Sequence, residues 1–506
     1  MPKHLIILTI ITYITSALNT KSTVEGLIGL FRHGARKSFE EIPNLTNFPT
    51  DFEQKGDLLT MGIRQEFNLG QMLRQAYPDL FPSTFVYNSL NITASEKNRT
   101  ISSAMSQVSG MFRNAKGFQV DTPKNPKLYQ PQWEGGSMDP DFQGDYSLPN
   151  GMVIAPILSY DDSTNFLFKS DQTCAKIQKA CVKSAQLEET ENWDTLEDAY
   201  KIFQKNNFSI QEMYGDPNQP DSFESFGIIS DALTGLLFRD PQNRQPNFSF
   251  DQQAHMIFVN SLFIYSRFSS NAMRKHYLTP LFREWVAILE NLTRFVPNQH
   301  TLASLLSDDD YSKIQLYFGH QENLSAVLLE LIDEHAVDKI RELYQKLKSE
   351  ANSVSDQDQY DAFEAKVIKQ YPLSHVGYGA NLLFELVSND KDGKAVFLIP
   401  DQLSIRMLLN GKPVHFKEQE SNVMPLRQFI MLLKQSIQDD FESACGNELF
   451  SYNRFNFPMT VIVVVLVCIN ALLIIAYYIL HRHIYNKKRE TERKLGSYVG
   501  QRLISS

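Results

Sequence analysis

Residues 24–36 of this chain read VEGLIGLFRHGAR, and the fold starts from this stretch. Residues 24–31 form a short apolar run with β-branched and aromatic members, which predicts a buried strand. The strand runs into Arg32-His33-Gly34, where the glycine allows a tight turn. In an open α/β sheet, ligands bind at the carboxyl ends of the strands, so this turn is a candidate binding site.

The side chains of Arg32, His33 and Arg36 suit phosphate chemistry. Guanidinium groups match the oxygens of a phosphate and neutralise its charge. A histidine between them can act as a nucleophile, because one ring nitrogen attacks while a hydrogen bond holds the other. An Arg-His-Gly tripeptide also occurs by chance, so this interpretation depends on the rest of the chain.

Strands and helices alternate at both ends of a helix-rich middle. Hydrophobic periodicity predicts the following elements: strands at 84–90, 313–318, 381–387 and 395–399, with a hairpin turn at 390–393, and helices at 58–77, 100–112 and 323–332. Residues 114–156 read as loop and residues 163–295 are mostly helical in pattern. This order predicts an α/β sheet domain with a helical insertion at about residues 115–300.

The composition is that of a globular protein, with 42% hydrophobic and 21% charged residues among 506. The net charge of -9 at pH 7 argues against nucleic acid as a partner, because basic surfaces bind phosphate backbones. Small phosphorylated substrates stay possible, since they need only a local cluster of arginines. The histidine spacing is not typical of metal ligands and no P-loop occurs, so we expect no metal or organic cofactor.

Both ends of the chain carry apolar segments. Residues 1–17 have the pattern of a secretory signal peptide. Residues 459–480 contain no charged side chain, and about 22 residues at ~1.5 Å each cover the ~30 Å core of a bilayer. Basic residues follow at once, which predicts a cytosolic tail at residues 481–506. We therefore expect a single-pass type I membrane protein whose residues 18–457 face the lumen of a lysosome or other acidic vesicle, or the cell exterior.

Cysteines and glycosylation sequons fit a secretory route. Cys174 and Cys181 would lie ~10.5 Å apart along a helix, which is too far for a disulfide. Any bridge should therefore join Cys445 to one of them. Seven Asn-x-Ser/Thr sequons also occur, as in many glycoproteins.

Taken together, several stretches resemble the histidine acid phosphatases, a branch of the phosphoglycerate-mutase-like superfamily. Residues 32–38 are similar to the family's Arg-His-Gly-x-Arg-x-Pro, and residues 59–74 to its Leu-Thr-x-x-Gly…Gly-x-x-Leu-Arg. Residues 381–387, 404–414 and 424–433 resemble its closing segment. The resemblance implies a mainly parallel sheet flanked by helices, with a smaller helical cap. It also implies that His33 accepts the phosphoryl group while Arg32 and Arg36 bind phosphate.

The chain departs from the family at the third phosphate-binding arginine. The family's Arg-Ser-Thr-Asp-x-x-Arg-Thr aligns with residues 93–100, so Thr93 takes the place of that arginine. One charge-assisted hydrogen bond is worth about 1.5–3 kcal/mol, so the loss would slow the reaction. Lys97 or Arg99 could substitute, or Lys97 could be a solvated turn residue and Arg99 a structural one.

A second departure concerns the proton donor. The family follows its second histidine with an aspartate, whereas this chain reads Gly319-His320-Gln321-Glu322. Gln321 cannot donate a proton, but Glu322 can, as in the His-x-Glu variant of the inositol-polyphosphate phosphatase branch. Alternatively, Glu322 only stabilises the positive end of the next helix dipole. We interpret His320 as a second phosphate ligand.

The sequence thus predicts an acid phosphomonoesterase that forms a phosphohistidine on His33. Glu322 would protonate the leaving alcohol, and acid pH would keep His320 and Glu322 protonated. The alternative is a catalytically impaired membrane ectodomain that binds a phospho-ligand or a partner, as Thr93 and Gln321 would suggest.

Overall fold

The computed structural model describes most of the chain between residues 23 and 445. The described residues are 23–39, 54–81, 85–113, 146–148, 151–161, 165–191, 223–237, 250–294, 312–351, 371, 373, 376–388, 403–417, 419, 421–445, 482 and 487. The chain forms two compact units, Met1–Phe441 and Glu442–Ser506, and the sheet described below belongs to the first unit.

Eight strands within the described residues form one mixed sheet, in the order β3-β2-β4-β1-β5-β6-β7, with β8 beside β6. The strands are β1 (Thr23–Arg32), β2 (Asn91–Ser95), β3 (Leu158–Tyr160), β4 (Ile314–Gly319), β5 (Asn381–Ser388), β6 (Leu403–Leu409), β7 (Lys412–Pro413) and β8 (Val423–Pro425).

Only one half of this sheet is parallel. β1, β4, β2 and β3 run parallel, whereas β5 pairs with β1 in the antiparallel sense and the strands beyond it continue that way. The expectation of a mainly parallel sheet is therefore corrected to a mixed one. β6 and β7 follow each other directly, and a short connection can join only antiparallel neighbours. Asn410 and Gly411 make one such turn, between β6 and β7, with φ values of 51° and 74°.

Helices cover both faces of the sheet. The described helices are α2 (Thr60–Ala76), α3 (Asn98–Met111), α4 (Phe166–Thr173), α5 (Ala175–Glu191), α8 (Phe223–Leu237), α9 (Phe250–Ser266), α10 (Asn271–Arg294), α12 (Gln321–Leu331), α13 (Ala336–Ala351), α15 (Leu426–Gln435) and α16 (Phe441–Cys445).

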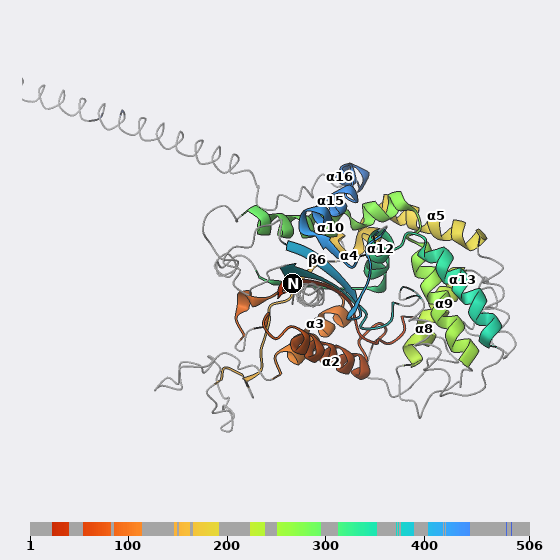
Figure 1. The fold of residues 1–506 in the computed structure, drawn as a ribbon, viewed down its shortest axis with the longest axis horizontal. Helices are drawn as coiled ribbons and strands as arrows, with labels where there is room; N and C mark the ends of the chain where they lie inside the picture. The colour runs from red at the N-terminus through yellow and green to blue at the C-terminus, as the bar shows by residue number, and fades with distance from the viewer. Residues whose placement is uncertain are drawn as a thin grey trace, which may run out of the picture. The chain divides into compact units, whose positions relative to one another are not determined.

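Alternate side chains of the strands pack against different helices. Leu27 and Phe31 of β1 belong to the core cluster under α2 and α3. Phe384 of β5 points the other way, with its ring centroid 5.1 Å from that of Trp285 in α10 and 5.5 Å from that of Phe429 in α15. Figure 1 shows α2 and α3 on one side of the sheet and α10, α12 and α15 on the other. Burial on both faces explains why these strands read as continuous apolar runs.

The predicted strand at residues 84–90 is wrong by several positions. Tyr87–Ser89 forms a 3-10 turn, and the strand is β2, which follows it. Phe85 belongs to the stretch that was predicted as a strand. Its ring instead packs in an aromatic cluster at the end of α3, with its centroid 5.1 Å from that of Phe112. The strand at 313–318, the first strand and the helices at 58–77 and 100–112 are confirmed within a few residues. Residues 390–399 lie outside the described residues.

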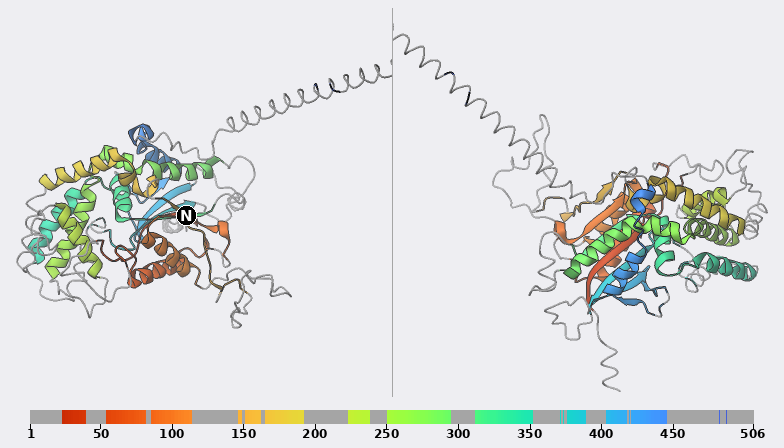
Figure 2. Two further views of the ribbon diagram at one scale, coloured as in Figure 1. Left: turned by 180° about the vertical axis from the view of Figure 1, so that it is seen from behind. Right: turned by 90° about the horizontal axis from the view of Figure 1, so that it is seen from above.

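α8, α9 and α13 form a separate helical group beside the sheet. Figure 2 shows this group at one end of the sheet, both from behind and from above. α8 packs along α9, and α9 also contacts α12 and α13. We refer to α8 and α9 as the cap. They meet the sheet where the parallel strands end.

The remaining predictions concern the ends and the cysteines. Residues 1–17 and 459–480 lie outside the described residues, and no helix in the described part is long and apolar enough to cross a membrane. Cys174 and Cys445 are disulfide-bonded, while Cys181 is a buried free thiol. The prediction that a bridge uses Cys445 and only one of the other two is confirmed.

Candidate active site

The pairing of β1 with β4 brings two histidines together. Arg32 and Gly319 are the last paired residues of these parallel strands, so His33 and His320 leave the sheet side by side. Their ring centroids are 5.6 Å apart and the rings are nearly perpendicular. The site predicted at the strand ends is thus built from two segments that lie almost 290 residues apart in sequence.

The turn after β1 lies against the first residues of α2, and only glycine fits there. A Cβ atom on Gly34 would lie 2.6 Å from the carbonyl oxygen of Gly62, and one on Gly62 would lie 2.1 Å from that of Ala35. The Gly34 amide donates to Ser103 Oγ (3.1 Å), and the Ala35 amide donates to Gln65 Oε1 (2.9 Å). α2 and α3 therefore fix the backbone around His33.

The protonation state of His33 follows from its neighbours. Its Nδ1 lies 2.8 Å from the Gly34 carbonyl oxygen, which can only accept, so Nδ1 carries the hydrogen and Nε2 keeps its lone pair. Burial, followed by the charges of Arg99, Arg32 and Arg36, holds the pKa of His33 well below its ordinary value. His33 is therefore neutral in mildly acidic solution.

Three arginines surround this ring. Arg32 donates to the Val376 carbonyl and its guanidinium lies 4.2 Å from the centre of the Tyr378 ring. Arg36 donates to Asp231 Oδ2 of α8 (2.7 Å), and Arg99 of α3 donates to His320 Nδ1 (3.2 Å). The Nε atoms of all three arginines are buried without a hydrogen-bond partner among the described residues. Buried donors are normally satisfied, so three such groups at one cavity indicate an anion site.

Arg99 is the third arginine around His33. Thr93, the residue aligned with the family's third phosphate-binding arginine, does not take that arginine's place in the cavity. Thr93 lies inside β2, paired with Tyr317 and Leu158, and is absent from the described lining of the cavity. Arg99 follows β2 at the second position of α3, where its side chain reaches back over the strand ends. Of the alternatives that the sequence leaves open, the geometry therefore favours Arg99 as the substitute for the arginine missing at position 93. Lys97 precedes α3 and is likewise not among the described lining residues.

His320 is neutral, contrary to the expectation that acid pH would keep it protonated. Its Nδ1 accepts from Arg99, so its hydrogen is on Nε2, which donates to Ser95 Oγ (2.8 Å). Burial, followed by Lys169 and Arg99, holds its pKa well below the ordinary value.

Glu322 and Gln321 open α12 directly after His320. Glu322 Oε1 lies 3.9 Å from Arg267 Nη1, and the side chain is about a quarter exposed. Burial opposes ionisation of Glu322, but Lys169 and Arg267 outweigh it, so its pKa is lowered. The carboxyl is thus ionised over more of the acid range than expected. Gln321 donates to Asn260 Oδ1 of α9 (2.9 Å) and is buried.

The three arginines, the two histidines, Gln321 and Glu322 line one cavity of ≈ 190 Å³. It is lined by Arg32, His33, Arg36, Ser38, Phe39, Arg99, Gly227, Ile228, Asp231, Asn260, Phe263, Ile264, Arg267, His320, Gln321 and Glu322. Every residue predicted for the site lines it. Local sequence patterns did not indicate Asp231 or Arg267, because Asp231 lies within α8 and Arg267 directly follows α9, and neither belongs to a recognisable motif. No group of three His, Cys, Asp or Glu side chains that could hold a metal occurs in the described residues.

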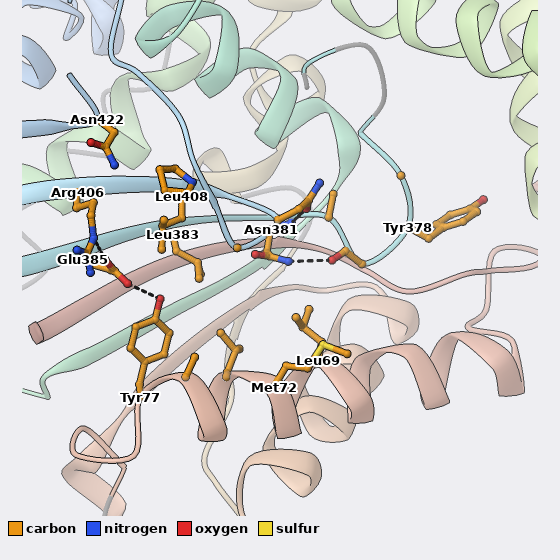
Figure 3. Close-up of a pocket in the computed structure, with 18 residues that line it drawn as sticks. Leu69, Met72, Tyr77, Tyr378, Asn381, Leu383, Glu385, Arg406, Leu408 and Asn422 are labelled. Atoms are coloured by element: carbon orange, nitrogen blue, oxygen red, sulfur yellow. Dashed lines mark hydrogen bonds and ion pairs between the residues drawn. The ribbon is translucent and has the colours of Figure 1, made fainter. Parts of the chain in front are cut away.

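A larger cavity of ≈ 720 Å³ lies between α2 and strands β5 and β6 (Figure 3). Its charged groups satisfy one another: Glu385 accepts from the Tyr77 hydroxyl (2.7 Å) and from Arg406. Its described lining includes no histidine. We therefore place the chemistry in the smaller cavity, where arginines and histidines gather.

A family model described as the histidine phosphatase superfamily (branch 2) matches residues 23–410. Prostatic acid phosphatase of Bos taurus is 28% identical over 101 residues, covering 19% of this chain and 25% of that protein. Putative acid phosphatase 5 of Caenorhabditis elegans is 33% identical over 92 residues, covering 18% and 21%. The chain therefore aligns with about a quarter of the length of these relatives or less.

Solved phytase structures have a similar fold. The phytase from Citrobacter braakii has a TM-score of 0.50 at 11% identity, over 83% of this chain and 99% of that one. Hafnia alvei phytase in complex with myo-inositol hexakis sulphate has a TM-score of 0.50 at 14% identity, over 84% and 98%. Identities this low carry the likeness of fold alone. Because the family model spans most of the chain, the protein belongs to branch 2 of the histidine phosphatase superfamily.

Proposed function

We propose that this protein hydrolyses phosphate monoesters at acid pH through a phosphohistidine on His33. The observation that carries the proposal is the His33 ring, whose Nδ1 is held by Gly34 and whose Nε2 lone pair stays free in an arginine-lined cavity. A neutral imidazole fixed in this tautomer is a nucleophile ready for phosphorus.

The arginines bind the phosphoryl group. Four arginines and two carboxylates line the cavity, which leaves an excess of two positive charges for a phosphate dianion. We assign the guanidinium groups of Arg32, Arg36 and Arg99, which line the cavity, to its oxygens. Neutral His320 adds no charge. Because its Nδ1 accepts from Arg99 and its Nε2 donates to Ser95, we assign it the role of positioning Arg99, in place of the direct phosphate contact expected from the sequence.

The first chemical step transfers the phosphoryl group to His33. Nε2 attacks phosphorus, the bond from phosphorus to the ester oxygen breaks, and Glu322 gives its proton to the leaving alkoxide. The imidazolium that forms is stabilised because its Nδ1–H already donates to Gly34. In the second step Glu322, now ionised, takes a proton from water. The hydroxide attacks phosphorus, the bond from phosphorus to Nε2 breaks, and inorganic phosphate leaves.

The ionised state of free Glu322 is compatible with this role. A bound dianion would face Glu322, oppose its ionisation and raise its pKa, so the complex holds the proton that the free enzyme lacks. In the free enzyme the pKa of Glu322 is lowered, so its protonated fraction grows as pH falls but does so at lower pH than for an ordinary glutamate. Burial and the neighbouring arginines also lower the pKa of His33, so its neutral form extends further into the acid range. Both effects favour activity in acid.

The catalytically impaired alternative rests on Thr93 and Gln321. Arg99 lines the cavity and offers a guanidinium there, but the family's pattern has an arginine at both positions, so Thr93 still leaves the site one arginine short of that pattern. We keep membrane anchoring, with residues 18–457 lumenal or extracellular, as a proposal from the sequence.

Replacing His33 should abolish turnover. We expect His33→Ala to lose phosphate release from p-nitrophenyl phosphate at about pH 5, because it removes the Nε2 lone pair that we assign to accept the phosphoryl group. The measurement is phosphate release by purified full-length protein. Equal release by the variant and the parent would remove the enzymatic proposal.

Glu322→Gln should lower kcat by roughly 10²–10⁴-fold, the usual contribution of a general acid. It should also remove the rise of kcat/KM with falling pH, because that rise follows protonation of Glu322. Gln321→Ala is the matched control and should keep the pH profile. Loss of activity in Gln321→Ala alone would show that Glu322 is not the donor.

Arg99→Gln should weaken binding of inorganic phosphate by roughly 10- to 150-fold, which corresponds to the loss of a charged hydrogen bond worth about 1.5–3 kcal/mol. Thr93→Val should leave the Kd unchanged, because Thr93 lies within β2. Calorimetric titration measures both. The opposite ranking of the two variants would return the phosphate role to position 93.

A further inference from the structure

One wall of the active-site cavity comes from the cap and carries three apolar side chains beside the polar Asp231, Asn260 and Arg267. α8 contributes Ile228, and α9 contributes Phe263 and Ile264. Gly227 allows this arrangement, because a Cβ atom there would lie 2.4 Å from the Phe263 ring. The leaving group of a bound ester would therefore meet hydrocarbon from the cap.

A second ring extends this wall toward the phosphate site. Phe39 lines the cavity and lies between two arginines, with its centroid 4.0 Å from the Arg36 guanidinium and 4.7 Å from that of Arg99. Phe39 is 44% exposed, so part of its surface stays open beside the two guanidinium groups. Phe39 and Phe263 together offer aromatic contact surface beside the phosphate site.

The described cap side of the cavity offers no spare cation for a second phosphate. Arg267 is its only described cationic lining residue, and it pairs with Asp171 (2.9 Å) and Glu322 (3.9 Å). The Asp231 carboxylate of α8 also faces the cavity and pairs with Arg36. A further phosphate there would meet Asp231 and apolar side chains, and burying an unpaired anion is costly.

The volume of the cavity also favours a substrate with a single phosphoryl group. Its volume of ≈ 190 Å³ is below the roughly 300–1,000 Å³ of pockets that enclose drug-sized ligands. A single phosphoryl group with a ring-sized leaving group suits it better than a ring that carries several phosphates.

We propose, resting on the function proposed above, that the substrate is the monophosphate ester of a small, uncharged aromatic or apolar alcohol, and that inositol polyphosphates are excluded. Ile228, Phe263 and Phe39 select the leaving group, and Asp231 rejects additional phosphates. The chain thus shares a fold with phytases but has a different specificity.

The test compares kcat/KM of the full-length protein for phenyl phosphate, glycerol 2-phosphate and inositol hexakisphosphate. We expect phenyl phosphate to exceed glycerol 2-phosphate by about tenfold, as for apolar contacts in a specificity pocket, and inositol hexakisphosphate by about 100-fold or more. Equal or faster turnover of inositol hexakisphosphate would overturn the inference and leave the phosphatase proposal standing.

Variants of cap residues test whether the cap causes the preference for phenyl phosphate. Phe263→Leu and Phe263→Ala should lower kcat/KM for phenyl phosphate progressively, by up to about tenfold, with little change for glycerol 2-phosphate. Ile228→Lys should narrow the gap between phenyl phosphate and inositol hexakisphosphate. Val182→Lys, on the exposed side of α5, is the matched control and should leave the gap unchanged. An equal effect of both lysines would contradict the role of the cap.

Measuring the binding of ligands that the protein cannot hydrolyse tests the substrate preference independently of the proposed reaction. Phenylphosphonate and myo-inositol hexakis sulphate cannot be hydrolysed as phosphate esters, so calorimetry reports selectivity even in a protein without turnover. Selective binding of phenylphosphonate with no hydrolysis of any ester would contradict the reaction and support the inference. Equal or tighter binding of the hexakis sulphate would overturn the inference.

Discussion

The active site depends on the parallel pairing of β1 with β4, which ends at Arg32 and Gly319. Parallel strands point their carboxyl ends at the same edge, so the next residue of each strand enters one space. Those residues are His33 and His320. A slip of one residue would turn their side chains to opposite faces and dismantle the site. Burial on both faces of the sheet fixes the register, because Phe31 and Phe318 stack in the core at a centroid distance of 5.1 Å.

Around this edge the protein gathers several positive charges in a buried place, and each has a compensating contact. Asp231 pairs with Arg36, a backbone carbonyl and the Tyr378 ring face Arg32, and Arg99 donates to His320. The arginines and burial have one common consequence, which is to keep both histidines neutral. A group that would otherwise be protonated in acid therefore keeps the lone pair that a nucleophile needs. The same charges that favour a phosphate thus preserve the residue that attacks it.

The sequence predicted strands, helices and cavity-lining residues correctly where the local hydrophobic pattern matches the burial in the fold. The apolar runs at β1 and β4, the helical spacing of α2 and the Arg-His-Gly turn gave the strand-end site and its two histidines. β2 was misplaced because its sequence, NITAS, is polar, and the burial of Ser95 becomes intelligible only through its bond to His320. Arg99 was undervalued for a related reason: its role depends on how a helix starts over the strand ends. Asp231 and Arg267 come from the cap side with no motif, and only tertiary packing brings them to His33. The neutral state of His320 likewise follows from neighbours that sequence alone does not place.

The central claim is that Nε2 of His33 accepts the phosphoryl group, and direct trapping tests it. The full-length protein would be mixed with a phosphate ester for less than one turnover, denatured in alkali to preserve phosphohistidine, and examined by peptide mass spectrometry and phosphorus NMR. The account predicts one phosphoryl group on residue 33, attached to Nε2 because Nδ1 is held by Gly34. Steady turnover with His33 never phosphorylated, or phosphate trapped on another residue, would contradict it.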